Sequence, residues 1–205
     1  MKSIIHLRTL ALGVLLCGIA SFSPASANDY EKPEKALQTT IEALIDALHA
    51  DDQVLSYQSK REQIIAILNK DFSFDIIIQR ALGRNWKKLD ARQQDQVTGL
   101  ITDLVLQAYV KELKDGSRPR IRYEAAKPLS SSKIEIASKV EVKGTKVNLS
   151  YRLANLRDRG WQVYDVLVEG VSMVANYRKQ FDEHFQKKSA SDLIVLLKDK
   201  LQGSE

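Results

Sequence analysis

The amino-acid sequence predicts an α+β fold, in which one curved four-stranded antiparallel sheet packs against about six helices. Residues 30–114, and again those after 171, carry apolar side chains every three to four positions, which is typical of amphipathic helices. Between these regions apolar and polar side chains alternate, as in half-buried strands. The last alternating region ends in residues 161–168, which are apolar on both faces and predict a central, covered strand. Because helices and strands are segregated along the chain, we expect the helices on one face of the sheet.

Four helices are expected before the sheet, at about residues 30–50, 59–70, 76–82 and 90–114. Pro33 suits the first turn of the first helix, where a backbone N–H would have no partner. Gly83 is expected to end the third helix. Asp90, with Gln93 three residues later, resembles a capping box at the start of the fourth. Each segment carries one apolar stripe, which predicts one buried face.

The strands are expected at residues 121–125, 134–142, 147–153 and 161–168. Lys143-Gly144-Thr145 separates the middle two strands and predicts a hairpin turn. Gly170 is expected to end the last strand, and the spacing then predicts a helix over residues 171–187. A final helix follows, with Ser189 or Ser191 as its N-cap.

The first 27 residues have the pattern of a cleaved signal peptide. Two basic residues precede an apolar core at residues 10–20, and Ala25-Ser26-Ala27 fits the small-residue pattern of a cleavage site. The apolar core is too short for a stable membrane anchor, and no later stretch approaches the ~20 residues that a span requires. We therefore expect an exported protein, soluble in the periplasm.

Cleavage of 27 residues from 205 leaves 178, which suits a single domain over residues 28–205. The only cysteine, Cys17, falls within the signal peptide, so the mature chain uses no disulfide. The mature chain carries 29 basic and 26 acidic residues, a net charge of +3, with the two signs well mixed. This balance permits contact with anionic lipid surfaces, whereas nucleic acid is an improbable partner for an exported chain. We expect a monomer.

Signals for catalysis are weak in the mature chain. His49 and His184 lie among polar residues without a metal-ligand or nucleophile motif, so we expect no metal and no cofactor. Asp165 is the exception, because it lies in an apolar strand where an unpaired carboxylate would be costly. It is either a general base or, as we favour, a structural group paired with an arginine, a tyrosine hydroxyl or backbone amides. Glu169 is expected to brace the turn that follows.

Short motifs in two regions of the chain point to a known family. The C-terminal block contains Trp161-Gln162, Tyr164-Asp165, Glu169-Gly170-Val171-Ser172 and Tyr177-Arg178. The middle region contains Leu82-Gly83, Trp86-Lys87, Gln93-Gln94 and a helix with Tyr109. Together they resemble the MlaC (toluene-tolerance) family of periplasmic phospholipid-binding proteins. The chain departs from the family at Gln96-Val97 and Leu100-Ile101, where the family has a phenylalanine-rich pattern.

The resemblance implies a carrier, not an enzyme, that holds the acyl tails of a phospholipid in an apolar pocket enclosed by helices and sheet. Periodicity alone does not distinguish such a pocket from an ordinary packed core. The expected pocket walls are inward-facing residues of strands and helices: Leu82, Trp86, Val105, Tyr109, Ile134, Ile136, Leu149, Tyr151, Val166, Val168, Met173, Val174 and Tyr177. The lipid phosphate is expected at the mouth of the pocket, beside Lys87, Lys88, Arg178 and Lys179.

The resemblance also implies two partners. One is an inner-membrane ABC transporter with an MCE-domain subunit, and the other is an outer-membrane lipoprotein–porin complex. Exchange of lipid between them would maintain the lipid asymmetry of the outer membrane. Two alternatives remain open: a carrier of another apolar lipid such as a hopanoid, and a periplasmic enzyme on a similar cone-shaped fold that uses Asp165 or Glu169.

The signal peptide gives the first testable prediction. N-terminal sequencing of the protein exported to the periplasm should begin at Asn28, because cleavage follows Ala27. A retained N-terminus, or an acyl group on Cys17, would contradict the expected soluble form.

Overall fold

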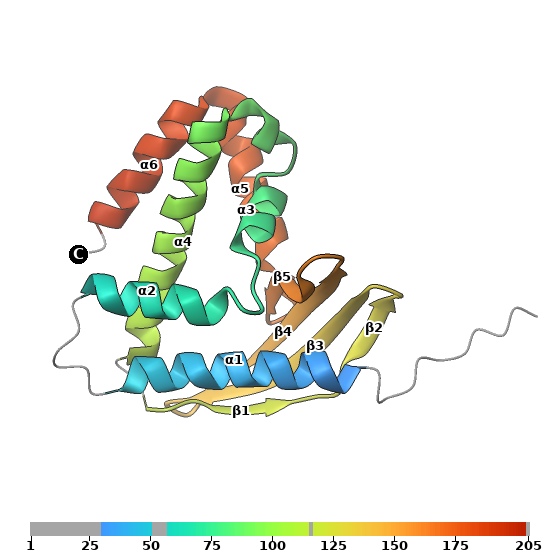
Figure 1. Ribbon diagram of the computed structural model, residues 1–205. Helices are drawn as coiled ribbons and strands as arrows, with labels where there is room; N and C mark the ends of the chain where they lie inside the picture. Colours follow the sequence, from blue (N-terminus) through green and yellow to red (C-terminus); the bar gives the residue numbers. More distant parts are fainter. Residues whose placement is uncertain (1–29, 51–56, 115–116, 204–205) are drawn as a thin grey trace, which may run out of the picture.

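The computed structural model of the protein describes residues 30–50, 57–114 and 117–203, and for Tyr57 and residues 109–114 it describes the backbone alone. The expected signal peptide, residues 1–27, lies outside the described residues. The first half of the chain is helical (Figure 1): α1 (Glu31–His49), α2 (Tyr57–Leu68), α3 (Phe74–Leu82), the 3-10 helix η2 (Gly83–Lys88) and α4 (Ala91–Lys114). The strands are β1 (Arg120–Tyr123), β2 (Lys127–Ser130), β3 (Lys133–Val142), β4 (Thr145–Leu156), β5 (Gly160–Val168) and β6 (Val171–Ser172). Two helices end the described chain, α5 (Met173–Lys187) and α6 (Ala190–Gln202). The predicted α+β class is confirmed.

The sheet has six antiparallel strands, not the predicted four. Its order is β1-β3-β4-β5-β6, and β2 also pairs with β3. The sequence did not indicate β2 because every residue of this strand is exposed, so no apolar alternation marks it, and it includes Pro128. The sequence analysis placed the two residues of β6 in the following helix. In the structure Val171 instead pairs with Val168 of β5.

A tight turn joins β5 to β6 and sets the direction of α5. Val168 pairs with Val171, so Glu169 and Gly170 are the two central residues of this hairpin. Both have positive φ angles, 49° and 79°, which fits a type I′ turn. The Glu169 carboxylate accepts hydrogen bonds from the backbone N–H of Asn148 (2.7 Å) and from its side chain (2.9 Å), and these bonds lower the pKa of Glu169. The predicted bracing role of Glu169 is confirmed.

Side chains cap two of the helices as the sequence predicted. At the start of α4, the N–H of Gln93 donates to Asp90 (2.8 Å), and the N–H of Asp90 donates to the Gln93 side chain (3.1 Å). Ser189, rather than Ser191, caps α6, and Asp192 completes a capping box with it. These bonds satisfy N–H groups that the helices themselves leave without partners.

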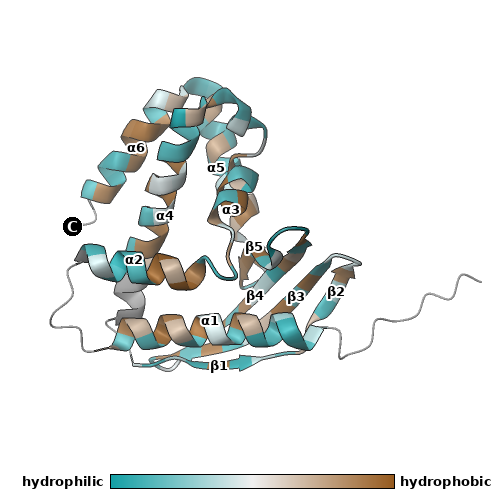
Figure 2. Ribbon diagram, viewed as in Figure 1, coloured by the Kyte–Doolittle hydropathy of each residue, from teal (hydrophilic) through white to brown (hydrophobic). Residues whose placement is uncertain are grey.

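The elements pack into two hydrophobic cores. In the first, α1 lies across one face of the sheet, with α2 beside it (Figure 1), and Leu37, Ile64, Ile134 and Leu153 are almost fully buried there. The C-terminal half of α2 is largely hydrophobic, whereas the strands carry both hydrophobic and hydrophilic residues (Figure 2). The second core brings together residues of α3, α4, α5 and α6: Ile78, Ala81, Leu82, Leu89, Val97, Val174, Phe181, Ala190, Leu193, Ile194 and Leu197.

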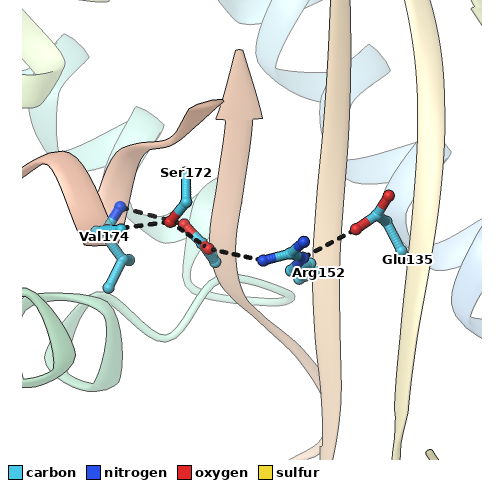
Figure 3. A network of polar contacts seen from close by, with 6 residues as sticks. Glu135, Arg152, Ser172 and Val174 are labelled. Atoms are coloured by element: carbon cyan, nitrogen blue, oxygen red, sulfur yellow. Dashed lines mark hydrogen bonds and ion pairs between the residues drawn. The ribbon is translucent and has the colours of Figure 1, made fainter. Parts of the chain in front are cut away.

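A polar network on the other face of the sheet fixes the start of α5 (Figure 3). Asp165 in β5 accepts hydrogen bonds from the Ser172 hydroxyl (2.7 Å) and from the backbone N–H of Val174 (3.2 Å). Arg152 in β4 lies beside it, with 3.7 Å between Nη1 and Oδ2, and also pairs with Glu135 in β3 at 2.8 Å. The three charged residues are direct neighbours in the strand register. The predicted structural pairing of Asp165, with an arginine and a helix-start amide, is confirmed.

This network predicts different effects of two substitutions at Asp165. Asp165→Leu should lower the free energy of unfolding by about 1–3 kcal/mol, because it leaves the Ser172 hydroxyl and the Val174 N–H without an acceptor. Asp165→Asn keeps one acceptor oxygen and should cost less. Denaturant unfolding of the two variants measures the difference, and equal stability would contradict the structural role.

Candidate functional site

An apolar cavity of about 310 Å³ lies between the sheet and the helices. Its walls come from α1 to α5 and from strands β1, β3, β4 and β5, together with residues of the connecting segments. Tyr151 and Tyr177 carry the only polar side-chain atoms among the described residues that line it. The cavity therefore provides a hydrocarbon-like surface, with no charged side chain in the described part of its wall.

The cavity lies where the two hydrophobic cores meet. Ile45, Leu68 and Tyr151 belong to the core beneath α1, whereas Ile78 and Phe181 belong to the core among the later helices, and all five line the cavity. The side chains of each hydrophobic core pack against one another. Between the two cores they leave a space, and this space is the cavity.

Eight of the predicted wall residues lie on this cavity. They come from α4, β4, β5 and the first part of α5: Val105, Leu149, Tyr151, Val166, Val168, Met173, Val174 and Tyr177. The hairpin, β5 and the following helix thus face one space, as the sequence analysis expected. The predicted central position of β5 is wrong, because β5 lies beside the two-residue edge strand β6. Their contact with a ligand stays a prediction.

Four predicted wall residues do not line the cavity. Ile134 and Ile136 are fully buried in β3, in the core that α1 closes over the sheet. Leu82 is fully buried among the later helices, and Trp86 of η2 packs against the same core. Alternation and helical spacing correctly gave the inward face of each element, but other side chains cover that face at these positions. The side chain of Tyr109 lies outside the described part of the chain.

The sequence analysis did not select the wall formed by α1, α2 and α3. This wall includes Ile41, Leu44, Ile45, Leu48, Ile64, Leu68, Ile77, Ile78 and Ala81, with Phe72 between α2 and α3 and Phe74 at the start of α3. These residues lie on apolar stripes that the sequence analysis recognised and interpreted as core. Helical spacing identifies a buried face but not whether that face meets side chains or an empty volume. The sequence pattern contained no signal that could have distinguished a packed face from a face that borders the cavity.

The predicted basic residues lie outside the cavity wall. Arg178 donates from Nε to the carbonyl of Arg80 (2.9 Å), at the end of α3, and Lys88 lies over the ring of Phe185, 5.1 Å from its centroid. Lys87 and Lys179 are exposed. Arg178 follows Tyr177, which lines the cavity and is 39% exposed, so this arginine lies next to an open part of the wall.

An open depression on the surface is bordered by Arg80, Gly83, Arg84, Arg178 and Asp182. Its cations already have partners within the protein: Arg80 lies 4.4 Å from the centroid of the Tyr164 ring, and Arg84 is 3.5 Å from Asp182. These contacts join α3 to β5 and η2 to α5. We therefore regard the internal cavity as the candidate site.

The catalytic alternative gains no support from the arrangement of Asp165. Val166 and Val168 point into the cavity, so the side chain of Asp165, which directly precedes Val166 in β5, points to the opposite face of the sheet. His49 and His184 each interact with a backbone carbonyl, at 2.9 Å and 3.0 Å. Within the described residues, no group of three His, Cys, Asp or Glu side chains is placed to hold a metal ion.

The fold and cavity define a class of α+β proteins in which helices and an open antiparallel sheet surround an apolar internal volume. Residues 38–199 match the family model of the MlaC protein. The chain therefore belongs to the MlaC family, and the resemblance inferred from its motifs is confirmed. A comparison with curated proteins finds no match.

One solved structure is similar over most of the chain. It is a phospholipid-binding protein from Ralstonia solanacearum in complex with a phospholipid. The TM-score is 0.74 at 20% sequence identity, and the match covers 83% of this chain and 97% of that one. At this identity the likeness shows a shared fold. None of the helices in the described ranges is both long and apolar enough to cross a bilayer.

Burial of Tyr151 makes the stability of the fold sensitive to alkaline pH. This residue is 5% exposed, and burial raises the pKa of its hydroxyl to about 12, although the nearby Ser138 hydroxyl partly opposes the rise. In the unfolded chain the same group ionises near its ordinary pKa of about 10. Below that pH both states are protonated and the fold keeps its full stability. Above it the unfolded state loses the proton first, so the free energy of unfolding falls as pH rises from about 10 to about 12.

Urea unfolding of the wild type and of Tyr151→Phe across this range tests the effect. The free energy of unfolding of the wild type should fall by up to about 1.4 kcal/mol per pH unit more than that of Tyr151→Phe, because phenylalanine has no proton to lose. Tyr177→Phe, at a partly exposed position, is the matched control and should follow the wild type. If the free energy of unfolding depends on pH in the same way for the wild type and Tyr151→Phe, Tyr151 does not contribute to the loss of stability at alkaline pH.

Proposed function

We propose that this protein is a periplasmic carrier that binds a phospholipid by its acyl tails. The observation that carries the proposal is the cavity: the described part of its wall is hydrocarbon except for two tyrosine hydroxyls and combines residues of helices and sheet. Membership of the MlaC family supports it. So does the shared fold with a protein that was crystallised with a phospholipid.

The energetics of lipid transfer explain why a carrier needs such a cavity. Two acyl tails carry roughly thirty methylenes, and exposing them to water would cost some ~20–25 kcal/mol at ~0.8 kcal/mol each. Inside an apolar cavity that cost is absent. The bilayer that the lipid leaves is equally apolar, so transfer between membrane and carrier is nearly balanced. The carrier then lowers the barrier to exchange, and its partners give the exchange a direction.

The size of the cavity bears on how the tails fit. About 310 Å³ is at the lower end of ligand pockets, which span roughly 300–1,000 Å³. A lipid with two tails is large for a pocket of this size, so we expect the walls to separate when it binds. The boundary between the two cores is the natural place for this movement, because residues of both line the cavity.

We propose that lipid is exchanged with two membrane complexes. These are an inner-membrane ABC transporter with an MCE-domain subunit and an outer-membrane lipoprotein–porin complex, and their joint role is the maintenance of lipid asymmetry. Arg178, beside the exposed Tyr177, is the proposed contact for the lipid phosphate, together with Lys179. A carrier of another apolar lipid, such as a hopanoid, would use the same cavity. Mass spectrometry of lipid extracted from the purified protein distinguishes these cargoes.

A charge placed on the cavity wall tests the proposal. Leu149→Glu and Val174→Arg should each abolish lipid binding, because filling the cavity would strip water from an unpaired charge. The empty variants should still fold, since water can enter and solvate the charge. The measurement is the number of phospholipid molecules per protein, with circular dichroism to verify folding.

Arg122→Glu is the matched control for these variants. Arg122 is exposed on β1 and pairs with Lys139 on β3, so a glutamate there gains an opposite charge as its neighbour. This control should carry lipid like the wild type. If the two cavity variants fold and carry as much lipid as the control, the cavity is not the binding site.

A further inference from the structure

An ion pair joins α2 to α4 beside the cavity, where the two helices cross (Figure 1). Arg61 Nε donates to Asp103 Oδ1 at 2.7 Å, and Arg61 Nη2 donates to the same oxygen. The two side chains are 23% and 28% exposed, so the pair is partly shielded from water but still reaches the surface. An ion pair that reaches the surface contributes little to the stability of a fold. Such a contact can therefore break and form again at small cost.

The ion pair lies at the boundary between the two hydrophobic cores. On α4, Leu104 packs against the second core, whereas Leu106 is buried in the first, so Asp103 lies next to the change from one core to the other. Arg61 lies one turn before Ile64, which is buried in the first core and lines the cavity. The ion pair thus links α2, a helix of the first core, to the part of α4 that reaches the second.

Both helices have their main packing partner elsewhere. α2 packs mainly against α1, and α4 packs mainly against α6. Ile64 and Leu68 of α2 border the cavity, as do Ile101 and Val105 of α4. Side chains that border an empty volume lack the dispersion contacts that a filled interface would provide. Separation of α2 from α4 therefore gives up few apolar contacts.

The connection from α2 to α3 also crosses the boundary between the cores, and it is firmly bound to the sheet. The N–H of Val163 in β5 donates to the carbonyl of Asp71 at 2.7 Å. The side chain of Gln162, also in β5, donates to the carbonyl of Lys70 (2.9 Å) and accepts from the buried hydroxyl of Ser73 (3.0 Å). These bonds fix the two cores to each other along β5. The side formed by α2 and α4 is held less firmly.

We propose that the cavity expands for a lipid with two tails by separation of α2 from α4, and that the Arg61–Asp103 ion pair keeps it closed. The proposal rests on the proposed lipid-binding function and adds the place at which the walls move. An interaction that exists only in the closed form favours that form, so its removal shifts the protein toward the expanded form. Water can replace the hydrogen bonds of both side chains once the helices part, because the pair already reaches the surface. A lipid with one tail needs less room, so its binding should not depend on this pair.

The rates at which the protein takes up two lipids test the proposal. Protein stripped of lipid is mixed with vesicles of a diacyl phosphatidylcholine that also contain its one-tailed lyso analogue, and mass spectrometry follows the amount of each lipid in the recovered protein over time. Arg61→Gln and Asp103→Asn each remove the ion pair. Both variants should take up the diacyl lipid about 2- to 5-fold faster than the wild type, the factor expected for one ion pair of this exposure. They should take up the lyso lipid at the wild-type rate.

Two further variants serve as controls. Arg61→Lys keeps the positive charge and should stay close to the wild type for both lipids. Arg118→Gln removes a different ion pair, in which Arg118 lies 2.6 Å from Asp46 of α1. That pair joins α1 to the segment before β1 and does not involve α2 or α4, so both lipids should be taken up at the wild-type rate. Circular dichroism verifies the folding of each variant.

Three outcomes would contradict the proposal. An unchanged uptake of the diacyl lipid in Arg61→Gln and Asp103→Asn would overturn it and leave lipid binding intact. Equal acceleration for both lipids, or the same acceleration in Arg118→Gln, would show a general loosening of the fold and would overturn it as well. Uptake of neither lipid by the wild type would overturn the proposed function itself.

Discussion

The arrangement of this protein depends on one carboxylate, Asp165, which joins the central sheet to α5. It accepts hydrogen bonds from Ser172 and from the N–H of Val174, and it lies beside Arg152 on the neighbouring strand. The first of these bonds orders the N-cap residue, whose hydroxyl in turn accepts from the N–H of Ala175 at 3.0 Å. The carboxylate thus holds the helix start at a fixed position on β5. A buried carboxylate is stable there because each neighbour supplies a donor or a positive charge.

This placement separates polar from apolar chemistry across the sheet. Glu135, Arg152 and Asp165 lie on one face, and the alternation of each strand then directs Tyr151 and Val166 to the other. The helix that Asp165 anchors contributes Met173, Val174, Tyr177 and Phe181 to the cavity wall. These charged groups stabilise the fold from the face of the sheet that is turned away from the cavity. An apolar cavity of this kind suits apolar chains, and its described wall offers few of the directional polar contacts that catalysis requires.

Much of the fold could be predicted from the sequence because its signals are local. The capping pair of Asp90 and Gln93 marked the start of α4, the positions around Gly144 marked a hairpin turn, and Gly170 marked the end of β5. The paired environment of Asp165 followed from the cost of burying a carboxylate in an apolar strand. The exposed strand β2 was missed, because edge pairing with β3 leaves no alternation in its own residues.

The sequence by itself therefore determined the class of fold, the inward face of most elements and the family. Only the tertiary structure decided which inward residues are packed and which face an open volume. Ile136 and Leu149 both lie on the inward face of the same hairpin, yet α1 covers the first, whereas the second lines the cavity. The physical reason is that periodicity reports burial, whereas a cavity depends on how closely two separate cores approach each other.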